Sequence, residues 1–242
     1  MIDVALTPAE LAPAAVAVVI DALRATSTAT WALAAGYERV LLADTVERAL
    51  TLRGPGRVLA GERGCVRPAE FHQGNSPQEA AERRGRELVL ATTNGTPAVV
   101  AATRVAPTVL LGSLLNLDAL IEELSPRDED VLIVCAGTDG QPALEDVYVA
   151  GRIAAALYGP RTDCALMAQA VARAHRSPLT AFAASANAAR LRQVGLGQDV
   201  GDCARESVLD VIGEARATDP GVAVAQLPAA PAVRAGRWMD AT

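Results

Sequence analysis

The chain has 242 residues, of which 51% are hydrophobic and 21% are charged, and its formal net charge is −6 at pH 7. That hydrophobic fraction supports a large buried core and excludes a disordered chain, and the acidic balance argues against nucleic acid as a partner. All 22 basic residues are arginines, which excludes a P-loop lysine, a Schiff-base lysine and a lysine general base.

Short apolar runs alternate with helix-forming segments through the first two-thirds of the chain. The predicted strands are 14–20, 39–43, 57–60, 87–91, 108–111 and 131–134. The predicted helices are 27–35, 46–52, 77–83, 97–103, 117–123 and 143–157. Strands this short and apolar are usually buried on both faces. The alternation therefore predicts an α/β fold, in which a mainly parallel or mixed sheet lies between two layers of helices.

The last third of the chain has a different pattern. Residues 162–175, 178–184 and 187–194 are predicted to form consecutive helices, and residues 221–226 one final strand. No low-complexity linker separates these parts from the rest. We therefore expect a single α/β domain over residues 1–242 with a helical C-terminal portion.

The N-terminus and the cysteines predict a cytoplasmic protein. Residues 1–4 carry no basic region ahead of an apolar run, and no segment reaches about 18 uninterrupted apolar residues, so neither a signal peptide nor a membrane span is expected. The four cysteines form no Cys-x-x-Cys pair, and only two histidines occur. This pattern argues against a structural zinc site and against a disulfide framework.

Polar residues follow the first long apolar strand. Asp21 could bind a metal or act as a nucleophile, and Arg24 could bind a phosphate, carboxylate or sulfonate through two hydrogen bonds. Thr26, Ser27 and Thr28 could cap the next helix and present N–H groups to an anion. An ordinary helix cap and an Asp21–Arg24 ion pair explain the same residues equally well.

Two further loops carry polar residues beside glycines. In Gly61-Glu62-Arg63-Gly64 a carboxylate and a guanidinium between glycines suit the close approach of a ligand, although a solvated surface turn is the more common outcome. Asn75 and Ser76 precede Pro77, which is an ordinary start of a helix. A function for Asn75 and Ser76 therefore needs support from elsewhere.

The strongest anion-binding pattern lies at the end of the apolar run 88–91. Thr92, Thr93, Asn94, Gly95 and Thr96 gather hydroxyls, an amide and a flexible glycine just ahead of a predicted helix. Free backbone N–H groups and the helix dipole favour an anion at such a junction. Ser113 offers another hydroxyl directly after the strand 108–111.

Three residues later in the chain complete the candidate site. Cys135 follows a strand and could act as a thiolate nucleophile, but Gln141 stands where a Cys-x5-Arg phosphatase loop needs arginine, which favours a small buried cysteine. Glu145 and Asp146 open a helix, where carboxylates favour the helix dipole. They could equally hold Mg²⁺, which prefers oxygen ligands.

Taken in order along the chain, these segments resemble the 2-phosphosulfolactate phosphatase family. The matching segments are Val19-Ile20-Asp21-Ala22-Leu23-Arg24-Ala25-Thr26-Ser27-Thr28, Gly61-Glu62-Arg63-Gly64, Gly74-Asn75-Ser76-Pro77, Thr92-Thr93-Asn94-Gly95-Thr96, Gly112-Ser113 to Asn116, Cys135-Ala136-Gly137, and Leu144-Glu145-Asp146 to Gly151. The resemblance implies an α/β fold and a Mg²⁺-dependent phosphatase that converts 2-phosphosulfolactate to sulfolactate and phosphate, a step toward coenzyme M in methanogens. The C-terminal part matches more loosely, with Asp199 and Cys203 as the closest candidates.

Combining the residues with the resemblance gives a full set of expected roles. The expected catalytic residues are Asp21, Arg24, Arg63 and Cys135. The expected substrate-binding residues are Thr26, Ser27, Thr28, Asn75, Ser76, Thr92, Thr93, Asn94, Gly95, Thr96 and Ser113. The expected Mg²⁺ ligands are Asp21, Glu62, Glu145 and Asp146. Direct attack by water and covalent catalysis by Asp21 both stay open.

The chain departs from the family pattern at two places. Gln73 ends a run that usually resembles Gly-Phe-Asp, and Pro97 stands where an arginine commonly follows Asn-Gly-Thr. A phosphatase for another small phosphorylated carboxylic acid therefore stays an alternative, as does a non-catalytic anion-binding protein. In each case the expected partner is a small anionic molecule rather than nucleic acid or a membrane, and a homo-oligomer is left open.

Overall fold

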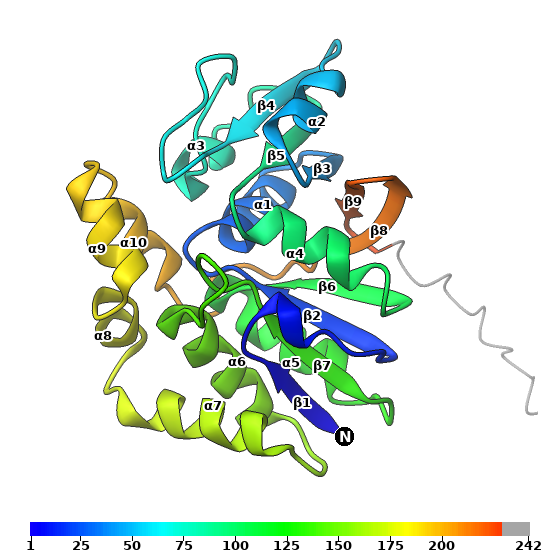
Figure 1. The fold of residues 1–242 in the computed structure, drawn as a ribbon, viewed down its shortest axis with the longest axis vertical. Helices are drawn as coiled ribbons and strands as arrows, with labels where there is room; N and C mark the ends of the chain where they lie inside the picture. Colours follow the sequence, from blue (N-terminus) through cyan, green and yellow to red (C-terminus); the bar gives the residue numbers. More distant parts are fainter. Residues whose placement is uncertain (229–242) are drawn as a thin grey trace, which may run out of the picture.

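The computed structural model describes residues 1–228, which form a nine-stranded mixed sheet and ten α-helices (Figure 1). The strands are β1 (Ile2–Ala5), β2 (Val16–Ile20), β3 (Arg39–Ala43), β4 (Arg57–Gly61), β5 (Glu87–Ala91), β6 (Thr108–Gly112), β7 (Val131–Cys135), β8 (Glu214–Asp219) and β9 (Val222–Gln226). The helices are α1 (Ala25–Ala34), α2 (Val46–Thr51), α3 (Pro77–Ala81), α4 (Gly95–Ala102), α5 (Leu117–Leu124), α6 (Leu144–Ala156), α7 (Asp163–Ala174), α8 (Pro178–Ala183), α9 (Ala186–Gln193) and α10 (Gln198–Cys203). Residues 229–242, which the predicted domain also included, lie outside the described residues.

The sheet consists of two groups of parallel strands joined by an antiparallel hairpin. One group contains four parallel strands in the order β1, β7, β2 and β6. The other group contains three parallel strands in the order β3, β5 and β4. Between the groups, β8 pairs antiparallel with β6 and with β9, and β9 pairs antiparallel with β3. The sheet is therefore mixed, and the apolar runs of the sequence form its parallel parts.

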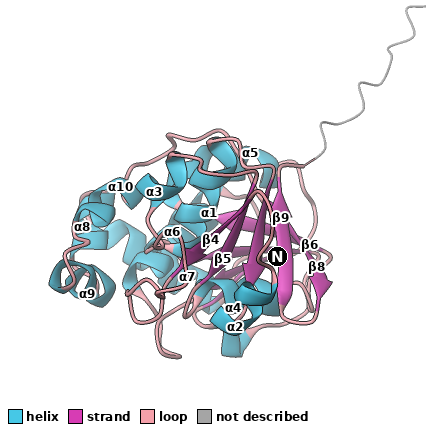
Figure 2. Cartoon of the chain, turned by 90° about the horizontal axis from the view of Figure 1, so that it is seen from above, coloured by secondary structure: helices cyan, strands magenta, loops and turns pink. Residues whose placement is uncertain are grey.

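Alternating residues of the central strands face two separate hydrophobic layers. Val18 and Ile20 of β2 pack with side chains of α5, α6 and α7, whereas Ala17 and Val19 pack with those of α1 and α4. Both α1 and α4 contact strands of the two parallel groups, while α2 packs on β3 and β5. Helices consequently cover both faces of the sheet (Figure 2).

The predicted α/β class, with its helical C-terminal portion, is confirmed. β3 and β5 have the predicted bounds, and the other predicted strands differ only at their ends. β1, β8 and α10 were not predicted: β1 is a short edge strand, and β8 is largely exposed and polar, so hydrophobic periodicity does not reveal it. α1 and α4 begin earlier than expected, which places Thr26 and Thr96 inside helices.

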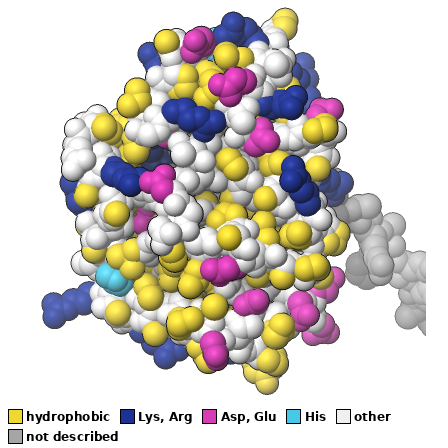
Figure 3. All heavy atoms as spheres, in the orientation of Figure 1, with side chains coloured by type: hydrophobic (Ala, Val, Ile, Leu, Met, Phe, Trp, Pro, Cys, Tyr) yellow, Lys and Arg dark blue, Asp and Glu magenta, His cyan; other side chains and the backbone are white. Residues whose placement is uncertain are grey.

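The C-terminal helices form one flank of the molecule. α8, α9 and α10 lie together there, and α10 contacts α3 (Figure 1). On the face drawn in Figure 3, arginine and acidic side chains are interspersed over the surface. Within residues 1–228, no helix has the length and apolar character needed to cross a bilayer.

Candidate active site

Loops that follow four strands converge with α9 on one pocket. The strands are β2, β4, β5 and β7, so both parallel groups contribute at the carboxyl ends of their strands, where ligands usually bind in such sheets. The pocket is lined by Asp21, Leu23, Arg24, Glu62, Gly64, Cys65, Asn75, Thr93, Asn94, Gly137, Thr138, Asp139, Asn187, Arg190 and Leu191. Six predicted site residues are thereby brought together: Asp21, Arg24, Glu62, Asn75, Thr93 and Asn94.

Asp21 lies at the end of β2, beside the first residues of α1 and α4. Its Oδ1 accepts a hydrogen bond of 3.2 Å from the N–H of Ala25, and its Oδ2 lies where a Cβ on Gly95 would overlap it. Burial raises the pKa of Asp21 to about 7, and repulsion from Glu62 and Glu145 acts in the same direction. This carboxyl can therefore take up or release a proton near neutral pH.

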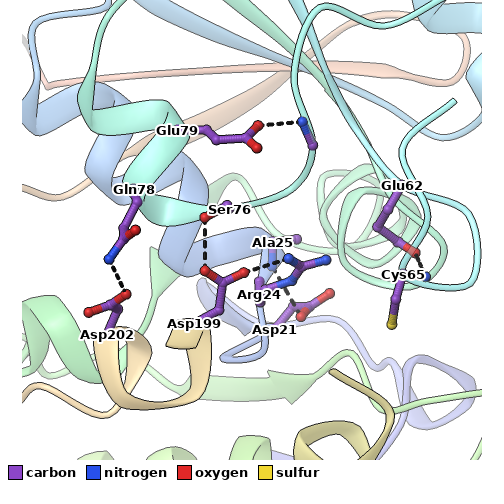
Figure 4. Close-up of polar contacts among 11 residues, drawn as sticks. Asp21, Arg24, Ala25, Glu62, Cys65, Ser76, Gln78, Glu79, Asp199 and Asp202 are labelled. Carbon is purple, nitrogen blue, oxygen red and sulfur yellow. Dashed lines mark hydrogen bonds and ion pairs between the residues drawn. The ribbon is translucent and has the colours of Figure 1, made fainter. Parts of the chain in front are cut away.

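Arg24 is held beside Asp21 by a buried ion pair. Its Nη1 donates to Oδ2 of Asp199 at 2.6 Å, and the two side chains are only 3% and 5% exposed. The hydroxyl of Ser76 donates to the other oxygen of Asp199 at 2.8 Å (Figure 4). Ser76, a predicted substrate-binding residue, thus helps to fix Asp199, and Asp199 of α10 fixes the guanidinium that lines the pocket.

Glu62 joins the loop after β4 to the loop after β5. Its Oε1 accepts a hydrogen bond from the N–H of Thr93, and its Oε2 accepts one from the N–H of Cys65, both at 2.7 Å. Both oxygens of this predicted metal ligand therefore already have backbone partners. Glu62 shapes the pocket wall and places a negative charge near Asp21.

Asp146, in the first turn of α6, connects the loops that follow β2 and β7. Its Oδ1 accepts from the N–H of Ala22 at 2.8 Å, and its Oδ2 accepts from the N–H of Gly137 at 3.0 Å. Burial, together with the charges of Glu145 and Asp21, raises the pKa of Asp146 well above its usual value. Asp146 does not itself line the pocket but positions two segments that do.

Glu145 has one oxygen free for a further partner. Its Oε1 accepts a hydrogen bond of 2.6 Å from Nδ2 of Asn187, whereas its buried Oε2 has no hydrogen-bond partner in the part of the chain that is described. Burial raises the pKa of this carboxyl as well. Since an unpartnered buried carboxylate oxygen is costly, Oε2 is a candidate atom for binding a cation or a water.

Helix α9 contributes residues that the sequence did not reveal. Asn187 also donates to Oγ1 of Thr138 at 2.7 Å, and Arg190 donates from Nη1 and Nη2 to Oδ2 of Asp139, both at 3.0 Å. These partners are 49 and 51 residues apart in the sequence. No local motif could have indicated that α9 closes one side of the pocket.

Several predicted hydroxyls do not face the pocket. Thr26 and Ser27 donate to carbonyl oxygens just before α1, at 2.9 and 2.8 Å, and the Oγ1 of Thr96 accepts from the N–H of Thr92 at 2.9 Å. These bonds hold the strand-to-helix junctions in shape. The predicted hydroxyl residues that are buried outside the pocket lining are Thr26, Ser27, Thr28, Ser76, Thr92, Thr96 and Ser113.

Two predicted catalytic residues also lie outside the pocket lining. Arg63 is exposed in the turn after β4 and does not line the pocket. Cys135 is fully buried at the end of β7, where burial and the nearby charge of Asp146 raise the pKa of its thiol. A protonated, inaccessible thiol is not a nucleophile, so we withdraw Cys135 from the catalytic candidates.

The carboxylates of the site differ in how well they suit Mg²⁺. Within residues 1–228, no three His, Cys, Asp or Glu side chains are grouped so that they alone could hold a metal ion. Mg²⁺, however, is commonly bound by one or two carboxylates together with waters and substrate oxygens. Oδ2 of Asp21 and the unpartnered Oε2 of Glu145, a residue outside the pocket lining, fit that donor chemistry better than Glu62 and Asp146. In those two carboxylates both oxygens accept backbone hydrogen bonds.

The comparisons with known proteins all point to one family. A sequence model of the family described as 2-phosphosulpholactate phosphatase matches residues 2–218. A Thermus thermophilus protein named "Probable 2-phosphosulfolactate phosphatase" is 45% identical over 200 residues, covering 78% of this chain and 83% of the relative. Proteins with the same name from Thermotoga petrophila and Deinococcus radiodurans are 38% and 41% identical, covering 88% and 81% of this chain and 94% and 86% of their own.

Proposed function

This chain belongs to the 2-phosphosulpholactate phosphatase family, and we propose that it hydrolyses (2R)-2-phospho-3-sulfolactate to 3-sulfolactate and inorganic phosphate. One observation in the structure carries the proposal. At the strand ends, Asp21, a buried carboxyl, lines the same pocket as Arg24, a guanidinium fixed by a buried ion pair. The names of the relatives support this choice of substrate.

Asp21 is the proposed reactive group. In one route its carboxylate takes a proton from a water that attacks phosphorus, and then returns a proton to the lactate oxygen as the P–O bond breaks. In the other route the carboxylate itself attacks phosphorus and forms an acyl phosphate that water hydrolyses. Either route starts from the ionised carboxylate of Asp21.

Arg24 is the proposed phosphate ligand. A guanidinium forms strong charge-assisted hydrogen bonds with phosphate oxygens, and its ion pair with Asp199 fixes its orientation before substrate arrives. Thr93 and Asn94, directly before α4, line the same pocket and offer further polar groups. Donors fixed in advance are the ones that stabilise charge in a phosphoryl-transfer transition state.

Asp21 and Glu145 are the proposed holders of a Mg²⁺ ion, which when bound would polarise phosphate oxygens and lower the pKa of a bound water. The unpartnered Oε2 of Glu145 supports this choice. Glu62 and Asp146 then act by holding loops rather than as ligands.

Phosphate release from synthetic 2-phospho-3-sulfolactate tests the proposal. We expect turnover by the wild-type protein in Mg²⁺, its loss in EDTA, and a loss of at least about 10³-fold in kcat for Asp21→Asn. Asp202→Asn, an acidic-residue control on the surface of α10, is expected to retain activity. Full activity in Asp21→Asn would remove Asp21 from the mechanism, and a trapped phosphoenzyme would select the covalent route.

A panel of small phosphorylated acids tests the alternative substrate. Gln73 and Pro97, the departures from the family pattern, do not line the pocket. We therefore expect the highest kcat/KM with 2-phospho-3-sulfolactate. Binding of these acids without any phosphate release would instead indicate a non-catalytic anion-binding protein.

A further inference from the structure

The pocket holds few positive charges for so anionic a substrate. Among the described residues that line it, the cations are Arg24 and Arg190, opposed by the carboxyls of Asp21, Glu62 and Asp139. The proposed substrate carries a phosphate, a carboxylate and a sulfonate. Each arginine is therefore expected to serve a different part of that molecule, since a single guanidinium cannot bind three separated anions.

The two arginines differ in how firmly they are held. Arg24 is fixed and buried by Asp199, and its charge acts directly on the pKa of Asp21. Arg190 instead forms an exposed pair with Asp139, whose side chain is 63% exposed against 51% for Arg190. Burial raises the pKa of the Cys65 thiol, and the charges of Arg24 and Arg190 oppose that rise, so both arginines lie near this residue of the pocket wall.

An exposed ion pair is easily exchanged for another. Such pairs contribute little to stability, because water screens them and two side chains must be held in one geometry. Both Nη atoms of Arg190 point at a single oxygen of Asp139, at 3.0 Å. The same two N–H groups can donate to two different oxygens of an incoming anion, which is the bidentate geometry that a guanidinium favours.

We propose that Arg190 leaves Asp139 to bind the sulfonate of the substrate and so determines its specificity. The inference rests on the proposed function. The phosphate and the carboxylate share carbon 2 of the lactate and belong together near Arg24 and Asp21. The sulfonate sits on the methylene arm and is the anionic group that remains. Apart from Arg24, Arg190 of α9 is the guanidinium among the described residues that line the pocket.

The test compares two substrates in matched variants. In Arg190→Ala, KM for 2-phospho-3-sulfolactate is expected to rise about 10- to 100-fold with little change in kcat, as for a lost charge-assisted bond. KM for 2-phospholactate, which keeps the carboxylate and lacks the sulfonate, is expected to change less than about threefold. Arg190→Lys is expected to recover only part of the loss, because lysine lacks this bidentate geometry.

Arg192→Ala is the matched control, because Arg192 lies on the same helix, carries the same charge and donates to the carbonyl of Ala183. A similar rise in KM in that variant would mean that net charge alone steers the substrate, which overturns the proposal. An equal loss with 2-phospholactate would also overturn it, by assigning Arg190 to the carboxylate.

Product binding separates this inference from the proposed function. Calorimetry with 3-sulfolactate and with lactate needs no turnover, and the preference for 3-sulfolactate is expected to fall about tenfold or more in Arg190→Ala. If the wild-type protein hydrolyses 2-phospho-3-sulfolactate but Arg190→Ala keeps its preference, only the role of Arg190 fails. If the wild-type protein neither hydrolyses this substrate nor prefers 3-sulfolactate, the proposed function fails as well.

Discussion

Arg24 and Asp199 are 175 residues apart in the sequence and form an ion pair of 2.6 Å that is almost completely buried. Ser76 donates to the second oxygen of Asp199, so the carboxylate is satisfied from two sides. A buried guanidinium without its partner is strongly unfavourable. Helix α10 therefore determines the orientation of Arg24, the residue directly before α1.

Removing Asp199 is expected to cost both stability and activity. Asp199→Ala leaves the charge of Arg24 buried and unpaired, which should lower the free energy of unfolding by about 3–5 kcal/mol. Asp199→Asn keeps an acceptor and is expected to recover part of both losses. Denaturant unfolding and steady-state kinetics measure the two effects, and a purely structural role would lower stability without changing kcat or KM of the folded protein.

Asp202 provides the control for this prediction. It lies on the same helix and accepts a hydrogen bond of 2.7 Å from Gln78 at the surface. Asp202→Ala is expected to change stability by less than about 0.5 kcal/mol. If Asp199→Ala were equally mild, the buried ion pair would not be important for the fold.

Replacing Asp21 is expected to stabilise the protein while removing its activity. The folded protein raises the pKa of Asp21 from 3.8 to about 7, mainly by burial. Between these pH values the folded state keeps a proton that the unfolded state releases, so stability falls as pH rises and stays low above pH 7. Asp21→Asn has no such proton, and should gain up to about 4 kcal/mol at pH 8 in EDTA.

The gain in Asp21→Asn should fall below about 1 kcal/mol at pH 4, where the carboxyl is protonated in the folded state and about half protonated in the unfolded state. Thermal unfolding of both proteins at pH 4 and pH 8 measures it. A stability difference that does not depend on pH would show that the pKa of Asp21 is not raised. A wild-type Tm at pH 8 that increases with Mg²⁺, but not in Asp21→Asn, would add support for a cation at this carboxyl.

Asp146 is expected to act as a connection between loops. Asp146→Ala leaves the N–H groups of Ala22 and Gly137 without their acceptor, at about 1–3 kcal/mol for each buried group. The loss of stability should be equally large in EDTA, because these hydrogen bonds do not depend on a metal. Glu145→Gln, which keeps an acceptor for Asn187, is expected to affect stability less. A destabilisation of Asp146→Ala seen only in Mg²⁺ would instead restore Asp146 as a metal ligand.

The sequence predicted the strands well because they are buried on both faces and therefore continuously apolar. It predicted the pocket in part, since Asp21, Arg24 and Glu62 directly follow such strands. It could not distinguish Thr93, which lines the pocket, from Thr92, which is buried outside the pocket lining. The sequence does not predict in which direction a side chain points once the strand has ended. Asn187 and Arg190 were missed since α9 reaches the pocket only through tertiary packing.

Gly95 is expected to be intolerant of any side chain. A Cβ there would overlap Oδ2 of Asp21 and lie 2.5 Å from the Cβ of Ala25, so α4 could not begin beside the carboxyl. Gly95→Ala should cost about 1–3 kcal/mol and reduce kcat, because overpacking would move Asp21 away from the pocket. In Gly201→Ala, on α10, the new Cβ meets no atom within 4 Å, and this helix is expected to gain up to about 1 kcal/mol. Unfolding and phosphate-release measurements on both variants test the contrast, and an active, stable Gly95→Ala protein would show that Asp21 does not depend on the start of α4.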